Sequence, residues 1–162
     1  AAEAGLAGRA RYGLPLAGPA ERRPALSDLL LIDSVAPLPR SLEEAAPRAR
    51  GTARVDPGGS VGVFWELYPP GGGPYEARLS IRLRDERGGF WKGLGAALGL
   101  TERQGGSVAL EWIEPISAGA AVQPRALVLA LPDLPAGSYA LELEVVLPDS
   151  RRARVERRIV VE

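Results

Sequence analysis

The stretch Ala77–Arg84, which reads Ala-Arg-Leu-Ser-Ile-Arg-Leu-Arg, has the most regular alternation of apolar and polar residues in the chain. Successive side chains of a β-strand point to opposite faces, so Leu79, Ile81 and Leu83 would share one face. Arginine and serine would occupy the other face and contact water. A strand of this kind is typical of an antiparallel sheet with one solvated side.

Similar short segments on both sides of Ala77–Arg84 predict further strands, because each is bounded by glycine or proline turns. They are Leu26–Ile32, Thr52–Val55, Val61–Tyr68, Val108–Trp112, Ala126–Leu131, Leu141–Val145 and a last strand ending at Val161. For Leu26–Ile32 a helix stays open as an alternative, since periodicity alone does not decide a run this short. With roughly seven to eight strands and no long amphipathic helix, the chain is predicted to be all-β, an antiparallel immunoglobulin-like β-sandwich.

Two local irregularities are also expected. Val155, Arg157 and Ile159 share a parity in the last strand, which would put an arginine on the apolar face, so we predict a β-bulge near Arg157 and Arg158. Earlier in the chain, Ser41 is followed three residues later by Glu44, a pattern that caps a short helical turn.

The composition of the first 24 residues differs from that of the rest. Residues 1–24 are rich in alanine, glycine, proline and arginine, and we interpret them as the end of a preceding domain or a linker, with a frayed terminus as the alternative. Residues 25–162 are predicted to form the sandwich domain. The chain contains no methionine, so we expect it to be part of a larger protein.

Composition excludes several classes of function. Lys+Arg and Asp+Glu both total 20, so the net charge is zero and the basic surface typical of nucleic-acid binders is not expected. The chain has no histidine and no cysteine, which rules out a Ser-His-Asp triad, a thiol nucleophile and the usual zinc, haem or iron–sulfur ligands. We therefore predict no catalytic residue, no metal and no cofactor. No apolar run approaches the roughly 20 residues of a membrane span.

Adjacent carboxylates were considered as catalytic pairs. A glycosidase needs two carboxylates at a fixed separation in a cleft, whereas acids on strands and turns are ordinarily solvated. We expect the second case for Glu43 with Glu44, Asp85 with Glu86, and Glu142 with Glu144. Asp28 lies in an apolar context, and we expect it to accept backbone hydrogen bonds at a strand end.

The segment Leu134–Leu143 is the most specific structural motif. A turn, a glycine and then Tyr139, opening an alternating strand, resembles the tyrosine corner of immunoglobulin-like sandwiches. There the tyrosine hydroxyl bonds to upstream backbone. We expect this structural role for Tyr139, with ligand binding as the alternative.

Three segments together, Leu26–Leu31, Phe64–Tyr68 and Leu134–Leu143, resemble the β-sandwich accessory region of bacterial GWxTD-domain proteins. The Gly-Trp-x-Thr-Asp signature itself is absent from the chain. The resemblance implies an immunoglobulin-like domain of a multidomain, extracytoplasmic bacterial protein. It implies no activity, because it supplies no catalytic residues to carry over.

The segment Phe90–Leu100 departs from the strand pattern. Trp91, Leu94 and Leu98 would fall on one face of a short helical insertion, beside Phe90 and flexible glycines. One interpretation is a plug that covers an open end of the sandwich. The other is a contact surface for a protein partner or a membrane interface, made by Phe90, Trp91, Leu94 and Leu98.

The remaining aromatic residues are of two kinds, those expected in the core and those that could be exposed to a ligand. Trp65 and Trp112 are expected in the core, whereas Tyr68, Tyr75 and Trp91 could form an exposed platform for a sugar. We expect a non-catalytic structural or protein-interaction module. The alternative is a carbohydrate-binding module, and a hydrolytic domain is the weaker rival.

Overall fold

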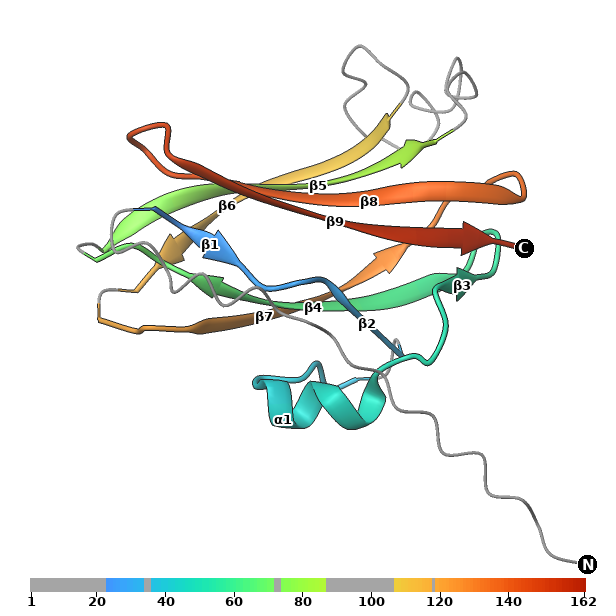
Figure 1. The fold of residues 1–162 in the computed structure, drawn as a ribbon, viewed down its shortest axis with the longest axis horizontal. Coiled ribbons are helices and arrows are strands. Elements are labelled where there is room, and N and C mark those ends of the chain that lie inside the picture. Colours follow the sequence, from blue (N-terminus) through green and yellow to red (C-terminus); the bar gives the residue numbers. More distant parts are fainter. Residues whose placement is uncertain (1–22, 34–35, 72–73, 87–106, 118) are drawn as a thin grey trace, which may run out of the picture.

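The computed structural model describes residues 23–33, 36–71, 74–86, 107–117 and 119–162. Within these residues the chain forms nine strands and two short helical turns, and the strands make two sheets that pack face to face (Figure 1). The elements are β1 (Ala25–Leu26), β2 (Leu30–Ile32), α1 (Leu42–Ala45), the 3₁₀ turn η1 (Ala46–Arg48), β3 (Arg54–Val55), β4 (Ser60–Tyr68), β5 (Tyr75–Asp85), β6 (Ser107–Ile116), β7 (Gln123–Ala130), β8 (Gly137–Val146) and β9 (Arg152–Val161).

The two sheets differ in width. In the narrower one, which we call sheet A, β4 lies in the centre and pairs with β1, β2 and β7. The wider one, sheet B, has the order β3-β9-β8-β5-β6. All of these pairs are antiparallel except β3 with β9, which is parallel. The predicted all-β, immunoglobulin-like sandwich is therefore confirmed, with one parallel pair added at the edge of sheet B.

The core lies between the sheets and follows the predicted alternation. From β4, the side chains of Val61, Val63, Trp65 and Leu67 are at most 1% exposed. They face apolar side chains of sheet B, all at most 3% exposed, which are Leu79, Ile81, Leu83, Leu141, Leu143 and Val145. Burial of each large apolar side chain stabilises the fold by roughly 1.5–3 kcal/mol. These packed side chains set the distance between the two sheets.

A second, smaller apolar cluster lies on the outer face of sheet A, where α1 covers it (Figure 1). It contains Ile32, Ala45 and Phe64. A Cβ atom on Gly62 would lie 2.5 Å from Cγ1 of Ile32, so only glycine fits beneath that side chain. The predicted helical turn is confirmed, because the hydroxyl of Ser41 accepts a hydrogen bond from the backbone N–H of the third residue after it.

Two local expectations are wrong. The predicted strand Leu26–Ile32 is split, because the pairing with β4 shifts by one residue between Leu26↔Leu67 and Leu30↔Phe64. The hydroxyl of Ser27 accepts the N–H of Glu66 at 2.9 Å within this irregular part. An extra residue opposite a regular strand is a β-bulge, so this segment between Leu26 and Leu30 contains one.

The bulge predicted near Arg157 and Arg158 is absent, since β8 and β9 pair without a break from Gly137↔Val161 to Val146↔Arg152. Arg157 therefore lies on the inner-facing parity and is half-buried. Among the described strands, only the two-residue β3 pairs with the outer edge of β9, at its C-terminal end. A long side chain near an edge of this kind reaches solvent without distorting the strand.

Candidate functional site

The sandwich has an open side where the edge strands of the two sheets, β6 and β7, follow one another in the chain. Among the described residues, β6 pairs only with β5 and β7 pairs only with β4. Each strand therefore leaves the backbone groups along one edge without a strand partner. Unpaired edges beside a gap between sheets are places where a sandwich accepts a ligand. This open side has one polar end and one apolar end.

Four side chains form a hydrogen-bonded cluster at the end nearest the turn between β6 and β7, and we call it the polar clasp: Trp112, Glu114, Gln123 and Arg125. The guanidinium of Arg125 donates to the Glu114 carboxylate at 2.7 Å and to the side-chain oxygen of Gln123 at 2.9 Å. The indole N–H of Trp112 donates to the other oxygen of that carboxylate at 3.1 Å. The Gln123 amide donates to the backbone carbonyl of Ser117 at 3.0 Å. The clasp therefore ties β6 to β7 through side chains.

The clasp faces inward, toward the core. Arg125 pairs with Trp65 across β7 and β4, so both side chains lie on the inner face of sheet A. The side chains of Arg125 and Glu114 are 27% and 18% exposed. Trp112 packs edge-on against Trp65, with ring centroids 6.4 Å apart at an interplanar angle of 61°. A partly shielded, charge-assisted hydrogen bond contributes roughly 1.5–3 kcal/mol, so the clasp closes this end firmly.

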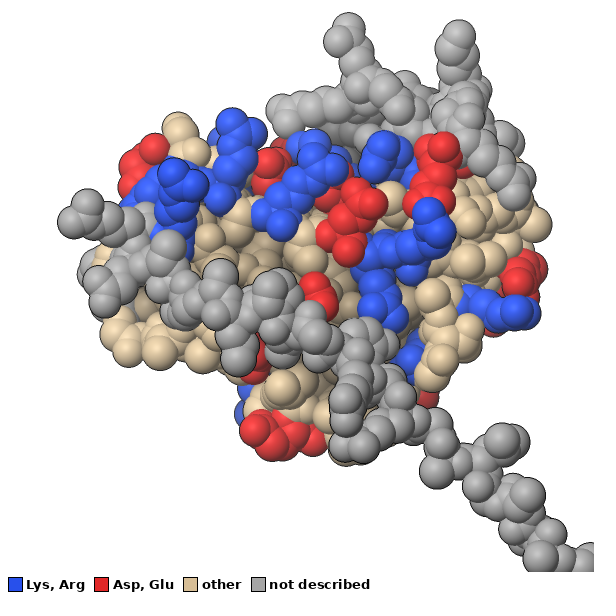
Figure 2. All heavy atoms as spheres, in the orientation of Figure 1, with Lys and Arg blue, Asp and Glu red and all other residues tan. Residues whose placement is uncertain are grey.

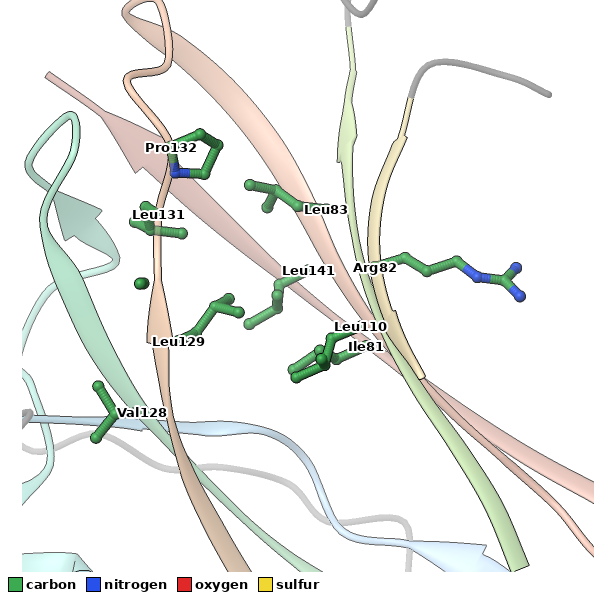
Figure 3. Close-up of a pocket in the computed structure, with 10 residues that line it drawn as sticks. Ile81, Arg82, Leu83, Leu110, Val128, Leu129, Leu131, Pro132 and Leu141 are labelled. Atoms are coloured by element: carbon green, nitrogen blue, oxygen red, sulfur yellow. The ribbon is translucent and has the colours of Figure 1, made fainter. Parts of the chain in front are cut away.

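An apolar groove of about 200 Å³ lies at the other end of the open side. Figure 3 shows six aliphatic side chains pointing into it from both sheets, and these residues define the apolar groove: Ile81, Leu83, Leu110, Leu129, Leu131 and Leu141. Pro132 closes one end, whereas the side chains of Val128 and Arg82 point away (Figure 3). Most of the lining is aliphatic carbon, so the groove is suited to hold an apolar group.

The groove exists because the sheets differ in width. Leu110 lies on the inner face of β6, opposite Ile81 in the pairing, yet it is 42% exposed. Sheet A ends at β7, and no described strand lies beyond β7 to cover this side chain. Leu131 and Leu141, deeper in the groove, are at most 5% exposed. The groove is thus an extension of the core that opens to solvent.

Sheet B carries a network of ion pairs on its outer face, and Figure 2 shows the two charge signs interleaved over it. Arg82 lies 4.0 Å from the carboxylates of both Glu144 and Glu111, on the two neighbouring strands. The other pairs are Arg84 with Glu156, Arg152 with Glu144, Arg154 with Glu142 and Glu156, and Arg158 with Glu86. Pairs of this kind contribute at most about 1 kcal/mol each, but they balance the charge of the face.

Several of the candidate catalytic carboxylates make structural contacts. Glu142 and Glu144 pair with arginines, Glu86 pairs with Arg158, and Glu44 accepts the backbone N–H of Arg40 at 2.9 Å. Glu142 is only 7% exposed, contrary to the expected solvation, because β8 lies between two strands that carry arginine.

Two further sequence expectations about burial are wrong. Asp28 is exposed, so its carboxylate does not have the buried environment expected for it. Ser80, expected to face water, is only 5% exposed, because it lies on β5, which is flanked by β8 and β6, amid long charged side chains.

Tyr68 and Tyr75 were candidates for a sugar-binding platform, and both are half-buried. The hydroxyl of Tyr68 donates to the Glu66 carboxylate at 2.7 Å. This hydrogen bond, with burial and the negative charge of Glu66, raises the pKa of Tyr68 to about 12. Burial raises the pKa of Tyr75, whose hydroxyl donates to the carbonyl of Pro70 at 3.4 Å. Both hydroxyls are thus engaged within the protein.

Tyr139 lies where the tyrosine-corner motif places it. Its side chain is 2% exposed, and its hydroxyl donates to the backbone carbonyl of Pro135, four residues upstream, at 2.8 Å. This bond spans the connection between β7 and β8, directly after the end of the groove at Pro132. Phe90, Trp91, Leu94 and Leu98, predicted as a helical insertion or partner contact, lie outside the described residues.

The sequence reasoning missed the clasp and the groove. It ended one predicted strand at Trp112 and began the next at Ala126, whereas β6 continues to Ile116 and β7 begins at Gln123. The available signal was parity, because Glu114 continues the period-two series of Trp112 and Arg125 continues that of Leu127. The polar residues and prolines at the strand ends masked it.

No protein-family model matches the chain, and no curated protein matches it in sequence. Among solved structures, superoxide reductase (neelaredoxin) from Ignicoccus hospitalis is similar with a TM-score of 0.43 and 14% identity, over 68% of this chain and 75% of that one. The sporulation control protein Spo0M from Bacillus subtilis is similar with a TM-score of 0.46 and 11% identity, over 86% of this chain and 49% of its own. This chain therefore spans about half of Spo0M. Likenesses at this level carry no argument about function.

Proposed function

We propose that the chain is a non-catalytic structural and protein-interaction module of a larger extracytoplasmic bacterial protein, and that it binds partners through the open side of the sandwich. The observation that carries this proposal is the apolar groove beside the unpaired edges of β6 and β7. Apolar side chains that open to solvent next to polar ones are typical of protein contact sites. The placement in a bacterial, extracytoplasmic protein rests on the resemblance to GWxTD-domain proteins.

The arrangement of ionisable groups supports a non-catalytic role. Several arginines and glutamates of sheet B pair with one another across the strands, as Arg82 does with Glu144 and Arg84 with Glu156. An active site instead gathers ionisable groups with strongly shifted pKa values in a cleft. The groove is lined mainly by aliphatic carbon, and the sequence supplies no histidine or cysteine. None of the described helices is long and apolar enough to span a membrane.

Selection of peptides from a random displayed library on the full chain tests this proposal. We expect enriched peptides that bind the parent and lose binding to Leu110→Glu, which places a charge at the mouth of the groove. Ile113→Glu is the matched control, because Ile113 is 63% exposed on the opposite face of the same strand. Peptides should bind this control as they bind the parent.

The carbohydrate-binding alternative is tested by measuring polysaccharide binding to the same protein. Binding of a polysaccharide that is lost in Tyr68→Ala or Tyr75→Ala would overturn the proposal. Turnover of a glycoside that depends on one carboxylate would do the same. Failure to enrich any peptide sensitive to Leu110→Glu would remove the groove as the contact surface.

A further inference from the structure

We infer that the open side binds by strand addition: an extended, apolar polypeptide segment of another protein pairs with the free edge of β7 and places side chains in the apolar groove. This inference rests on the proposed function and specifies how the partner is held. Three observations support it. They are which residues of β7 direct their backbone N–H and C=O groups to the free edge, the apolar lining of the groove, and the difference in width between the two sheets.

Two independent observations show which alternate residues of β7 direct their backbone groups toward β4 and which direct them toward the open side. The N–H of Leu131 donates to the carbonyl of Gly59 at 2.8 Å, on the side of β4. In an antiparallel strand, alternate residues direct both backbone groups to the same side. The odd-numbered residues of β7 therefore face β4. Pro124 has no N–H, and a proline is tolerated in a strand where its nitrogen faces a free edge. The even-numbered residues Ala126, Val128 and Ala130 thus present their backbone groups to the open side.

An added strand at this edge would complete sheet A where it is narrower than sheet B. Alternate side chains of the added segment would point inward, toward Leu110 and the groove, because side chains on neighbouring strands share faces. A volume of about 200 Å³ accommodates one large apolar side chain or two small ones. Since no charged side chain among the described residues points into the groove, charge complementarity calls for an uncharged, apolar segment (Figure 3).

A thin occupant fits this site better than a globular one. A stable interface between folded proteins buries roughly 800 Å² on each partner. Among the described residues that line the groove, only Leu110 and Val128 are large apolar side chains that are themselves exposed, on 42% and 46% of their surfaces. A second folded copy therefore lacks the apolar area it needs here. A single strand gains its affinity from backbone hydrogen bonds and uses the groove for specificity.

The free edge of β6 is the less suitable of the two. Pro115 lies in β6, so by the same parity argument its free edge belongs to Ala109, Glu111 and Ile113. Glu111 carries a charge that lies within 4.0 Å of Arg82. A charged side chain on an edge strand discourages pairing, whereas the corresponding residues of β7 are alanine and valine. The contrast selects β7.

The experiment uses the full chain and a synthetic peptide in which leucine alternates with threonine, with a lysine at each end. Binding is measured by calorimetry for the parent and for two variants at one position. Val128→Pro removes an N–H that faces the free edge and leaves the pairing with β4 in place, whereas Val128→Ala keeps the N–H. We expect the peptide to bind Val128→Pro about tenfold more weakly than Val128→Ala. If Val128→Pro does not fold, Ala130→Pro at the strand end makes the same test.

Amide hydrogen exchange gives a second readout. Peptide binding should slow exchange at Val128 and Ala130 more than at Leu127 and Leu129, whose N–H groups already face β4. Equal affinity of the two Val128 variants, with peptides still sensitive to Leu110→Glu, would overturn strand addition and leave the proposed function standing. Peptide binding only after residues 87–106 are replaced by a glycine–serine linker would assign the groove to this chain's own segment and also overturn the inference.

Discussion

The two ends of the open side are built from the same two strands but are closed in different ways. At the polar clasp, Glu114 and Arg125 reach across and join β6 to β7 directly. At the apolar groove, Leu110 and Leu129 lie on the same two strands, and a volume of about 200 Å³ stays open. Polar side chains with a partner can close a gap that is too wide for short aliphatic ones. We therefore expect the polar clasp to contribute mainly to the stability of the fold and the apolar groove to contribute mainly to partner binding.

The largest expected effect is at the clasp. Trp112→Ala removes a half-buried indole that packs against Trp65 and donates to Glu114. We expect a loss of about 2–3 kcal/mol in the free energy of unfolding, below the 3–5 kcal/mol of a fully buried tryptophan. Urea denaturation measures it. A loss under about 1 kcal/mol would show that this end is not held by the clasp.

The ion pair of the clasp should show coupling. Glu114→Ala leaves the guanidinium of Arg125 partly buried without its carboxylate, which should cost about 1–3 kcal/mol. Arg125→Ala should cost a similar amount, and the double variant should cost less than the sum. Denaturation of the three variants tests this. Additive losses would mean that the two side chains act independently.

The connection beside the groove depends on Tyr139. Tyr139→Phe removes the hydroxyl that donates to the carbonyl of Pro135, and we expect a loss of about 0.5–3 kcal/mol. Tyr139→Phe should leave the polar clasp unchanged, because the clasp lies at the start of β7 and the connection to β8 lies at its end. Thermal melts give the stability. An unchanged melting temperature would leave the tyrosine corner without its structural role.

The smallest effect is expected at the groove itself. Leu110→Glu and Ile113→Glu should each change the free energy of unfolding by less than about 1 kcal/mol, since both side chains are already exposed. The two variants should differ in peptide binding and agree in stability. A large loss of stability in Leu110→Glu alone would mean that the packing of Leu110 holds this end of the open side together, and it would end the contrast between the two regions.

Period-two alternation was enough to predict most of the strands and the main core. It identified the inner faces of β4 and β5, including Val61 and Leu79, because each strand buries one face against the other sheet. Short sequence motifs located the helical turn capped by Ser41 and the corner around Tyr139, since both depend on residues close in sequence. Local chemistry of this kind is visible without a fold.

Alternation failed where a neighbour from elsewhere in the chain decides the outcome. Arg157 was expected to force a bulge, but among the described strands only β3 pairs with the outer edge of β9, along part of its length, so the arginine is accommodated. Glu142 was expected in water, but arginines of the adjacent strand shield it. In both cases the environment comes from residues that are distant in sequence and close only in the folded sheet.

The sequence by itself determined the class of the fold and the chemistry excluded by the lack of histidine and cysteine, because alternation and composition are properties of the chain alone. The tertiary structure decided where the sandwich is closed and where it is open. Glu114 and Arg125 meet, whereas no described strand of sheet A covers Leu110, because in the part of the chain that the structure describes sheet A ends at β7 while sheet B extends to β6. The relative widths of two sheets follow from long-range pairing, which no local pattern encodes.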